Sequence, residues 1–345
     1  MGKPARLRII SQIEKARKSR LLSYVTSTRP GLEVQMAMDA IRRIYDHISP
    51  WTPRGTKVPR IDLFLYSNGG EGIVPWRLVT LLREHADEFC VLVPFAAFSA
   101  ATLTALGTDH IVMHPMAMLG PTDPTVANLF NPQDPTNPTR RLGISVEDVT
   151  AYIALIRDDA GIQHEEEVVQ AFDKLADKVH PLALGNVKRS LSQSRMMAKK
   201  LLSLHMHPTD DEHRIDQIVD NFTSKLFYHG HPINRREAQE ELELATVEYP
   251  PLRVKKAMWQ LYLHYEKEMK LNQPFAPASD FLAAFPDLKP NDLKTTAPAS
   301  ARLAFIESTT RSDVFSIDYE LSGQKLPDGS TNVTVIKKRE GWATE

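Results

Sequence analysis

The chain contains a single cysteine, Cys90, in 345 residues, so an internal disulfide and a zinc site built on several cysteines are excluded. Neither sign of charge is in excess. Lys and Arg number 42 and Asp and Glu 43, so the formal net charge of −1 gives the chain as a whole no attraction to nucleic acid or anionic membranes. The first twenty residues are basic and lack the apolar run of a signal peptide. We therefore expect a cytoplasmic protein.

A long uninterrupted apolar segment is also missing. Residues 90–107 come nearest to the length of a membrane span. Pro94 divides this segment, and Ser99, Thr102 and Thr104 dilute it, so the pattern favours a buried strand, a turn and a small-residue helix. The sequence thus predicts no membrane span.

Apolar strands and amphipathic helices alternate over the first third of the chain. Strands are predicted at 20–28, 61–67, 89–93 and 110–114, and helices at 34–48, 74–86 and 100–106. This alternation is typical of an α/β fold with a parallel sheet and crossover helices.

The rest of the chain has a different texture. A proline-rich loop follows Leu119, and the pattern is helical from about residue 145 to 207 and again at 259–271. A second proline-rich linker (274–298) leads to alternating segments around Pro327-Asp328-Gly329, which predict a β-hairpin. The expected division is an N-terminal helix (1–19), a main domain (20–245) with a helical extension from about 145, and a C-terminal part (246–345) with a helix, a linker and a small β element.

Two turns at successive strand ends carry the chemistry. Ser67-Asn68-Gly69-Gly70 follows one strand, and glycines there can present bare backbone N–H groups. Ser99 follows the next strand, with alanines on nearly every side. Each feature alone has an ordinary alternative: a plain strand-to-helix turn for the glycines and a helix N-cap for the serine. Together they would meet at the edge where parallel sheets hold their ligands, which fits acyl transfer.

Five segments together suggest a family. They are SNGG (67–70), AAFSAAT (96–102), MLGPTDP (118–124), HPLALGNVKRS (180–190) and YHGHPINRREA (228–238). This combination resembles the superfamily of Clp proteases and signal peptide peptidase A, which has the crotonase-like fold. Within it, the chain resembles the serine dehydrogenase proteinase (SDH) family.

The resemblance implies a serine peptidase that acts on peptides or proteins and forms a homo-oligomeric ring, trimeric or hexameric. By position it makes Ser99 the nucleophile and assigns the oxyanion hole to the backbone N–H groups of Gly69, Gly70 and Ala100. The chain departs from the family at Ala101, where glycine is usual, and the extra methyl group is expected to narrow the pocket.

The general base has several candidates. Clp-type enzymes carry a histidine after the next strand, but here that stretch contains Asp123 and no histidine, and His114 is the nearest alternative. Relatives of the signal peptide peptidase type use a Ser/Lys dyad, which requires a neutral lysine. Lys188 is the favoured base on this ground, with Lys174 and Lys178 as further alternatives.

No cofactor is expected, because the chain has neither a P-loop nor a dinucleotide-binding glycine motif. The histidine- and acid-rich stretch 205–213 lacks the spacing of a metal motif, so no metal site is predicted. Two other functions remain open: an inactive scaffold or binding protein on the same fold, and crotonase-like acyl-CoA chemistry.

Overall fold

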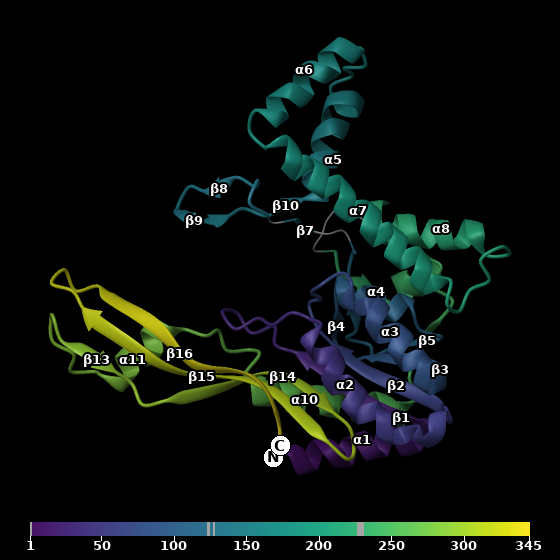
Figure 1. Ribbon diagram of the computed structural model, residues 1–345, viewed down its shortest axis with the longest axis horizontal. Helices are drawn as coiled ribbons and strands as arrows, with labels where there is room; N and C mark the ends of the chain where they lie inside the picture. The colour runs from purple at the N-terminus through teal and green to yellow at the C-terminus, as the bar shows by residue number, and fades with distance from the viewer. Residues whose placement is uncertain (1, 123–124, 127, 226–230) are drawn as a thin grey trace.

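The computed structural model describes residues 2–122, 125–126, 128–225 and 231–345. A nine-stranded sheet lies at its centre, in the order β12-β5-β3-β2-β1-β14-β15-β13, with β16 paired to β15 (Figure 1). Its strands are β1 (Arg20–Thr26), β2 (Val58–Tyr66), β3 (Ala86–Val93), β5 (His110–Met113), β12 (Val247–Glu248), β13 (Leu293–Thr295), β14 (Ala299–Glu307), β15 (Ser312–Lys325) and β16 (Thr331–Thr344). The first five of these strands run parallel, and β14 joins β1 antiparallel. The predicted α/β fold with a parallel sheet is confirmed.

Helices cover both faces of this sheet. One face carries α1 (Lys3–Arg17) and α10 (Leu252–Met269), and the other carries α2 (Asp39–Ile48), α3 (Val74–His85), α4 (Ala100–Leu106), α7 (Pro181–Leu202) and α8 (Glu212–Asp220). Two apolar clusters result because successive side chains of a strand point to opposite faces. On β2, Leu63 and Leu65 join the cluster under α2 to α4, whereas Phe64 joins the one under α1 and α10. Among the described helices, none is long and apolar enough to cross a membrane.

Smaller elements complete the chain. The short strands are β4 (Ala96–Ala97), β6 (Met118–Leu119), β7 (Thr125–Val126), β8 (Gln133–Asp134), β9 (Asn137–Arg141), β10 (Ile144–Ser145) and β11 (Ile233–Asn234). The remaining helices are α5 (Val146–Ala154), α6 (Glu165–Ala176), α9 (Arg235–Glu240) and α11 (Pro277–Ala284), with single turns at Ser49–Trp51, Pro53–Gly55, Leu155–Asp159 and Asn221–Lys225.

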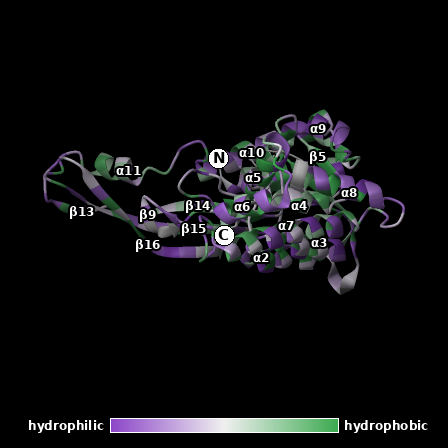
Figure 2. Cartoon of the chain, turned by 90° about the horizontal axis from the view of Figure 1, so that it is seen from above, coloured by the Kyte–Doolittle hydropathy of each residue, from purple (hydrophilic) through white to green (hydrophobic). Residues whose placement is uncertain are grey.

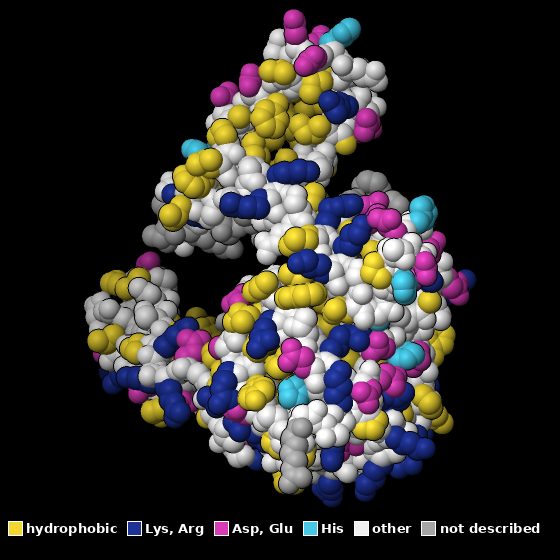
Figure 3. Space-filling view, turned by 45° about the vertical axis from the view of Figure 1, so that its right-hand side comes forward, with side chains coloured by type: hydrophobic (Ala, Val, Ile, Leu, Met, Phe, Trp, Pro, Cys, Tyr) yellow, Lys and Arg dark blue, Asp and Glu magenta, His cyan; other side chains and the backbone are white. Residues whose placement is uncertain are grey.

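Two arms extend from this body. A helical arm contains α5, α6 and the start of α7, and a C-terminal arm contains α11, β13 and the outer ends of β15 and β16 (Figures 1 and 2). Hydrophobic side chains lie exposed on the helical arm (Figure 3), among them Leu155, Val169 and Phe172. The C-terminal arm is larger than the small β element that the sequence predicted, because β15 and β16 are 14 residues each.

Most predicted elements are present, with corrected ends. The hairpin around Asp328 forms as β15 and β16. The predicted helix 34–48 begins only at Asp39, because Met36 pairs in extended form with Gly70. Helix α7 begins at Pro181, with His180 as its N-cap. The predicted helix 259–271 begins earlier, at Leu252, and the predicted linker contains α11.

A buried ion pair joins the N-terminal helix to the C-terminal strands. The Arg6 guanidinium donates to both carboxylate oxygens of Glu307, at 2.7 and 2.8 Å, and both side chains are fully buried. Tyr265 and Ser312 also donate to Glu307, each at 2.7 Å. Burial acts to raise the pKa of Glu307, but these donors prevail and the pKa is lowered. Glu307 is therefore a fully paired charge at the meeting point of α1, α10, β14 and β15.

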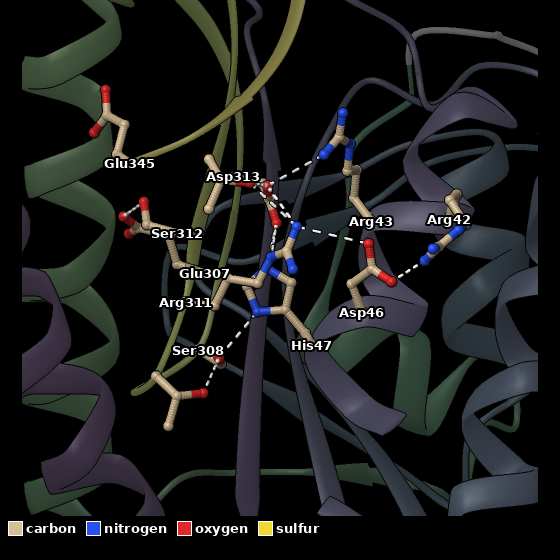
Figure 4. A network of polar contacts seen from close by, with 12 residues as sticks. Arg42, Arg43, Asp46, His47, Glu307, Ser308, Arg311, Ser312, Asp313 and Glu345 are labelled. Atoms are coloured by element: carbon tan, nitrogen blue, oxygen red, sulfur yellow. Dashed lines mark hydrogen bonds and ion pairs between the residues drawn. The ribbon is translucent and has the colours of Figure 1, made fainter. Parts of the chain in front are cut away.

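A second buried network fastens α2 to the same strands (Figure 4). His47 lies between the hydroxyl of Ser308, 2.9 Å from Nδ1, and the carboxylate of Asp313, 3.0 Å from Nε2. Arg311 also donates to Asp313. Although a serine, a histidine and an aspartate are connected here, all three are buried, so this network holds the fold together and does not face substrate.

Candidate active site

Ser99 lies at the sharp turn between β4 and α4. Its backbone has φ 52° and ψ −116°, a strained conformation outside the usual left-handed helical region. The hydroxyl makes no capping hydrogen bond to α4, so the N-cap alternative does not describe it. Thr102 braces the turn from inside α4, because its hydroxyl donates to the carbonyls of Ala97 (2.7 Å) and Gly120 (2.9 Å). The fold thus holds a strained serine with its hydroxyl available.

The glycine turn after β2 packs directly against this serine. Gly69 has φ 100°, and a Cβ atom there would lie 2.7 Å from the Phe98 carbonyl oxygen and 2.8 Å from Ser99 Cβ. At Gly70 a Cβ atom would lie 2.2 Å from the Met36 carbonyl oxygen. Both positions therefore require glycine, and the turn is held between residue 36 on one side and the serine turn on the other.

Backbone N–H groups at these turns differ in their partners. The Gly69 N–H donates to Ser67 Oγ at 3.0 Å, and that hydroxyl also accepts a hydrogen bond from Thr26. Within the described residues, the N–H groups of Gly70 and Ala100 have no acceptor. Of the three predicted oxyanion donors, Gly70 and Ala100 are thus free to bind a ligand oxygen, whereas Gly69 supports the turn.

A cavity of about 460 Å³ opens at Ser99. Nine of its fifteen lining residues have polar side chains, and the lining consists of Ser27, Glu33, Val34, Gln35, Asn68, Gly69, Gly70, Gly72, Ser99, Ala100, Leu103, Thr122, Ser190, Gln193 and Ser194. The predicted nucleophile and all three predicted donors lie in this one cavity. No lysine or histidine is among these lining residues.

Helix α7 forms one wall of the cavity, which the sequence analysis did not anticipate. Ser190, Gln193 and Ser194 recur at helical spacing on one side of α7, and the Ser194 hydroxyl donates to the Thr122 carbonyl at 2.6 Å. The sequence contains a signal for this wall, because polar residues recur on one side of a helix whose other side is apolar and packs in the core.

The predicted lysine bases lie away from this cavity. At about 100° per residue, Lys188 falls on the side of α7 opposite the lining residues Ser190 and Ser194, and it is exposed. Lys174, on α6, and Lys178, just after it, are exposed on the helical arm. A dyad with Lys188 stays a prediction, but this arrangement within one chain does not bring its amine to Ser99.

The other predicted residues have different surroundings. His114 stacks on Trp259 of α10, 5.0 Å between ring centroids, and burial together with Lys255 lowers its pKa. It packs toward α10 and does not line the cavity. Ala101 is fully buried in the core, so its methyl group does not narrow the space beside Ser99. Asp123 and residues 226–230, of which 228–230 begin the YHGHPINRREA motif, lie outside the described residues.

An α/β sheet with crossover helices, a strained serine turn and an adjacent glycine turn with free N–H groups together define the Clp-like class of folds. A model of the ClpP-like SDH-type serine proteinase family matches residues 2–198, more than half of the chain. The chain belongs to this family, as its motifs predicted.

Individual relatives are more distant. The uncharacterized protein MJ1495 of Methanocaldococcus jannaschii is 25% identical over 273 residues, covering 76% of this chain and 83% of the relative. A solved mutant of the 1510-N membrane-bound stomatin-specific protease is 19% identical over 40% of this chain and 63% of its own, with a TM-score of 0.26. A second mutant of that protease, in complex with a substrate peptide, is 11% identical over 66% of this chain and 94% of its own, with a TM-score of 0.27.

Proposed function

We propose that the protein is an active serine peptidase in which Ser99 is the nucleophile. The observation that carries this is the strained turn of Ser99, whose hydroxyl has no hydrogen-bond partner among the described residues and lies beside two N–H groups that are likewise free there. A turn of this kind exposes a nucleophile at the end of a strand. Structural serines have no need of such strain, which costs roughly 1–3 kcal/mol.

The chemistry follows from these positions. Ser99 Oγ attacks the carbonyl carbon of the scissile peptide, and its proton passes to a general base. The carbonyl oxygen becomes an oxyanion that accepts hydrogen bonds from Gly70 and Ala100. The C–N bond then breaks, the amine takes up the proton, and water hydrolyses the acyl-enzyme ester.

His231 is the base that the register of the small sheet β4-β6-β11 supports best. Ala97 and Ile233 both pair with Leu119 of β6. β4 ends at Ala97 and β11 begins at Ile233; if their registers were extended by two residues, Ser99 and His231 would lie opposite residue 121, two strand spacings or about 10 Å apart at Cα. His231 Nε2 lies 2.5 Å from Glu237 Oε1, and such a carboxylate orients an imidazole for proton transfer.

Three variants separate this base from the Ser/Lys dyad. His231→Gln is expected to lower kcat for a peptide substrate by about 10² to 10⁴, the usual contribution of a general base. Lys188→Met and the matched histidine control His114→Gln are expected to keep wild-type kcat. Loss of activity in Lys188→Met, with activity retained in His231→Gln, would establish the dyad instead.

A fluorophosphonate probe tests the peptidase proposal itself. Wild-type protein is expected to be labelled at Ser99, and Ser99→Ala is expected to be folded and unlabelled, because it removes a hydroxyl that does not cap α4. A folded wild type that takes no label and cleaves no peptide would favour the inactive scaffold. Binding of acyl-CoA by such a protein, measured by calorimetry, would favour crotonase-like chemistry.

The proposal includes a homo-oligomer that works in the cytoplasm. Exposed Leu155, Val169 and Phe172 on the helical arm support association, because a contiguous apolar surface is costly in water. Light scattering at micromolar concentration is expected to give a multiple of the 38.9 kDa chain mass, and a monomeric mass would contradict it.

A further inference from the structure

A strongly basic surface lies on the side of the sheet away from the cavity at Ser99. It is formed by α1 and α10, which pack against each other and cover the opposite face of the sheet from α4 and α7. Figure 3 shows Lys and Arg side chains along its lower edge, the side on which α1 lies in Figure 1. We call this surface the basic face and define it by seven exposed cations: Arg8, Lys15, Lys18, Arg253, Lys256, Lys267 and Lys270.

The outer side of α10 carries a regular stripe. It consists of Arg253, Lys256, Gln260, Leu263, Lys267 and Lys270, all exposed and spaced three or four residues apart. Helix α1 runs antiparallel beside it, because Ile9 borders one hollow with Lys267 and Gln12 borders another with Arg253. The two helices therefore present their cations on one continuous surface.

These cations have no opposite charge of their own. Within the described residues, none of the seven forms an ion pair. The three glutamates of α1 and α10 are at most partly exposed, and two are already engaged: Glu14 accepts a hydrogen bond from Leu21 N–H, and Glu268 pairs with Arg6 and Arg302. Although the whole chain is nearly neutral, the fold has collected unpaired positive charge on one side.

Helix stability does not explain this arrangement. Cations near the C-terminus of a helix interact favourably with its dipole, which accounts for Lys15, Lys18, Lys267 and Lys270. Arg253 and Lys256 lie near the N-terminus of α10, where the dipole disfavours positive charge and the first turn contains no acidic residue. These two cations are therefore held against a local cost, which indicates a binding role.

We propose that the basic face docks on an anionic phospholipid surface. Five of its seven cations are lysines, which suit a diffuse field of headgroups better than paired recognition of individual phosphates. Leu263, 40% exposed, lies within the stripe, and Leu252, 61% exposed, precedes it, so aliphatic side chains are available to enter the headgroup region. The stripe contains no aromatic residue for base stacking, which disfavours single-stranded nucleic acid. Docking by this face would leave the Ser99 cavity, across the sheet, open to substrate.

Vesicle sedimentation with the full chain tests this proposal. The protein is expected to sediment with phosphatidylcholine vesicles that contain about one third phosphatidylserine, to stay in solution with phosphatidylcholine alone, and to be released at about 0.5 M salt. The triple variant Arg253→Glu, Lys256→Glu, Lys267→Glu is expected to bind at least about 100-fold more weakly, since each cation near an anionic surface contributes about fivefold in affinity and three such losses multiply.

A matched triple variant, Arg77→Glu, Lys289→Glu, Lys294→Glu, makes the same change in net charge at exposed sites outside the basic face and is expected to bind like wild type. Circular dichroism verifies folding; if the basic-face triple is unfolded, the milder Lys267→Gln, Lys270→Gln variant must still lose about tenfold or more. The proposal is overturned if wild type ignores the anionic vesicles, if both triples lose binding equally, or if a nucleic-acid duplex at equal phosphate concentration displaces the protein from them.

Discussion

His47 offers a quantitative test of how the C-terminal strands are fastened to α2. Burial lowers the pKa of His47 to about 4, although the Asp313 carboxylate acts to raise it. An exposed histidine in the unfolded chain has a pKa of about 6.5, so between these values the unfolded state binds more protons than the folded state. The free energy of unfolding therefore falls as the pH falls through this window. The shift corresponds to about 3 kcal/mol in total, of which about 2 kcal/mol is lost between about pH 7 and pH 5.

Urea unfolding followed by circular dichroism at both pH values measures this loss. In His47→Gln the titrating group is gone, so acidification is expected to destabilise the variant by about 2 kcal/mol less than it destabilises wild type. His207→Gln, at an exposed histidine, serves as the control and is expected to keep the wild-type dependence. The pKa of Asp313 is lowered, so its own contribution is lost only below the usual aspartate range and does not enter this window. Equal acid losses for wild type and His47→Gln would refute the argument.

Three further changes test other parts of the structure. Gly69→Ala forces a methyl group against the serine turn and is expected to lower the rate of fluorophosphonate labelling more than about 100-fold, whereas Gly185→Ala, with open space around its Cβ and outside the cavity lining, should label normally. Arg6→Met leaves the Glu307 carboxylate buried without its cation and is expected to cost about 3–5 kcal/mol in urea unfolding; adding Glu307→Leu should recover part of that loss, and no recovery would contradict the account. Ala101→Gly is expected to lower stability by about 1 kcal/mol with labelling within about twofold of wild type; a large rise in labelling would show that the methyl group does obstruct the site.

Local patterns in the sequence predicted the central elements well, because their side chains are governed by burial. Residues 89–93, which end β3, are apolar and buried, and the helix Ala100–Leu106 is buried throughout and built of small and apolar residues with two threonines, so composition and length sufficed. The helix expected from residue 34 began late for a non-local reason: residue 36 pairs with Gly70, which no helical period can reveal. The proline of the His-Pro pair at 180–181 begins α7, because proline is favoured in the first turn of a helix.

The site was predictable only where a motif identified its residues. Ser99 and the two glycines were found because their turns follow successive parallel strands. The hydrogen bond from the Gly69 N–H to Ser67 Oγ is local to the turn, but the polar wall of α7 depends on how distant segments pack. The place of Lys188 in the sequence did not predict which way its side chain points. On a helix, an offset of two residues from Ser190 is enough to turn a side chain away from the cavity.

The position of β14 in the sheet has a consequence for how the protein is made. β1 pairs on one side with β14, nearly three hundred residues later in the chain, and Arg6 forms its ion pair with Glu307 across a similar separation in sequence. A ribosome therefore completes both turns of the candidate site long before the strand that closes the sheet leaves the exit tunnel. Contacts of such long sequence separation form slowly and leave unpaired edges exposed meanwhile. The edge of β1 that pairs with β14 is therefore expected to stay open until synthesis is nearly finished.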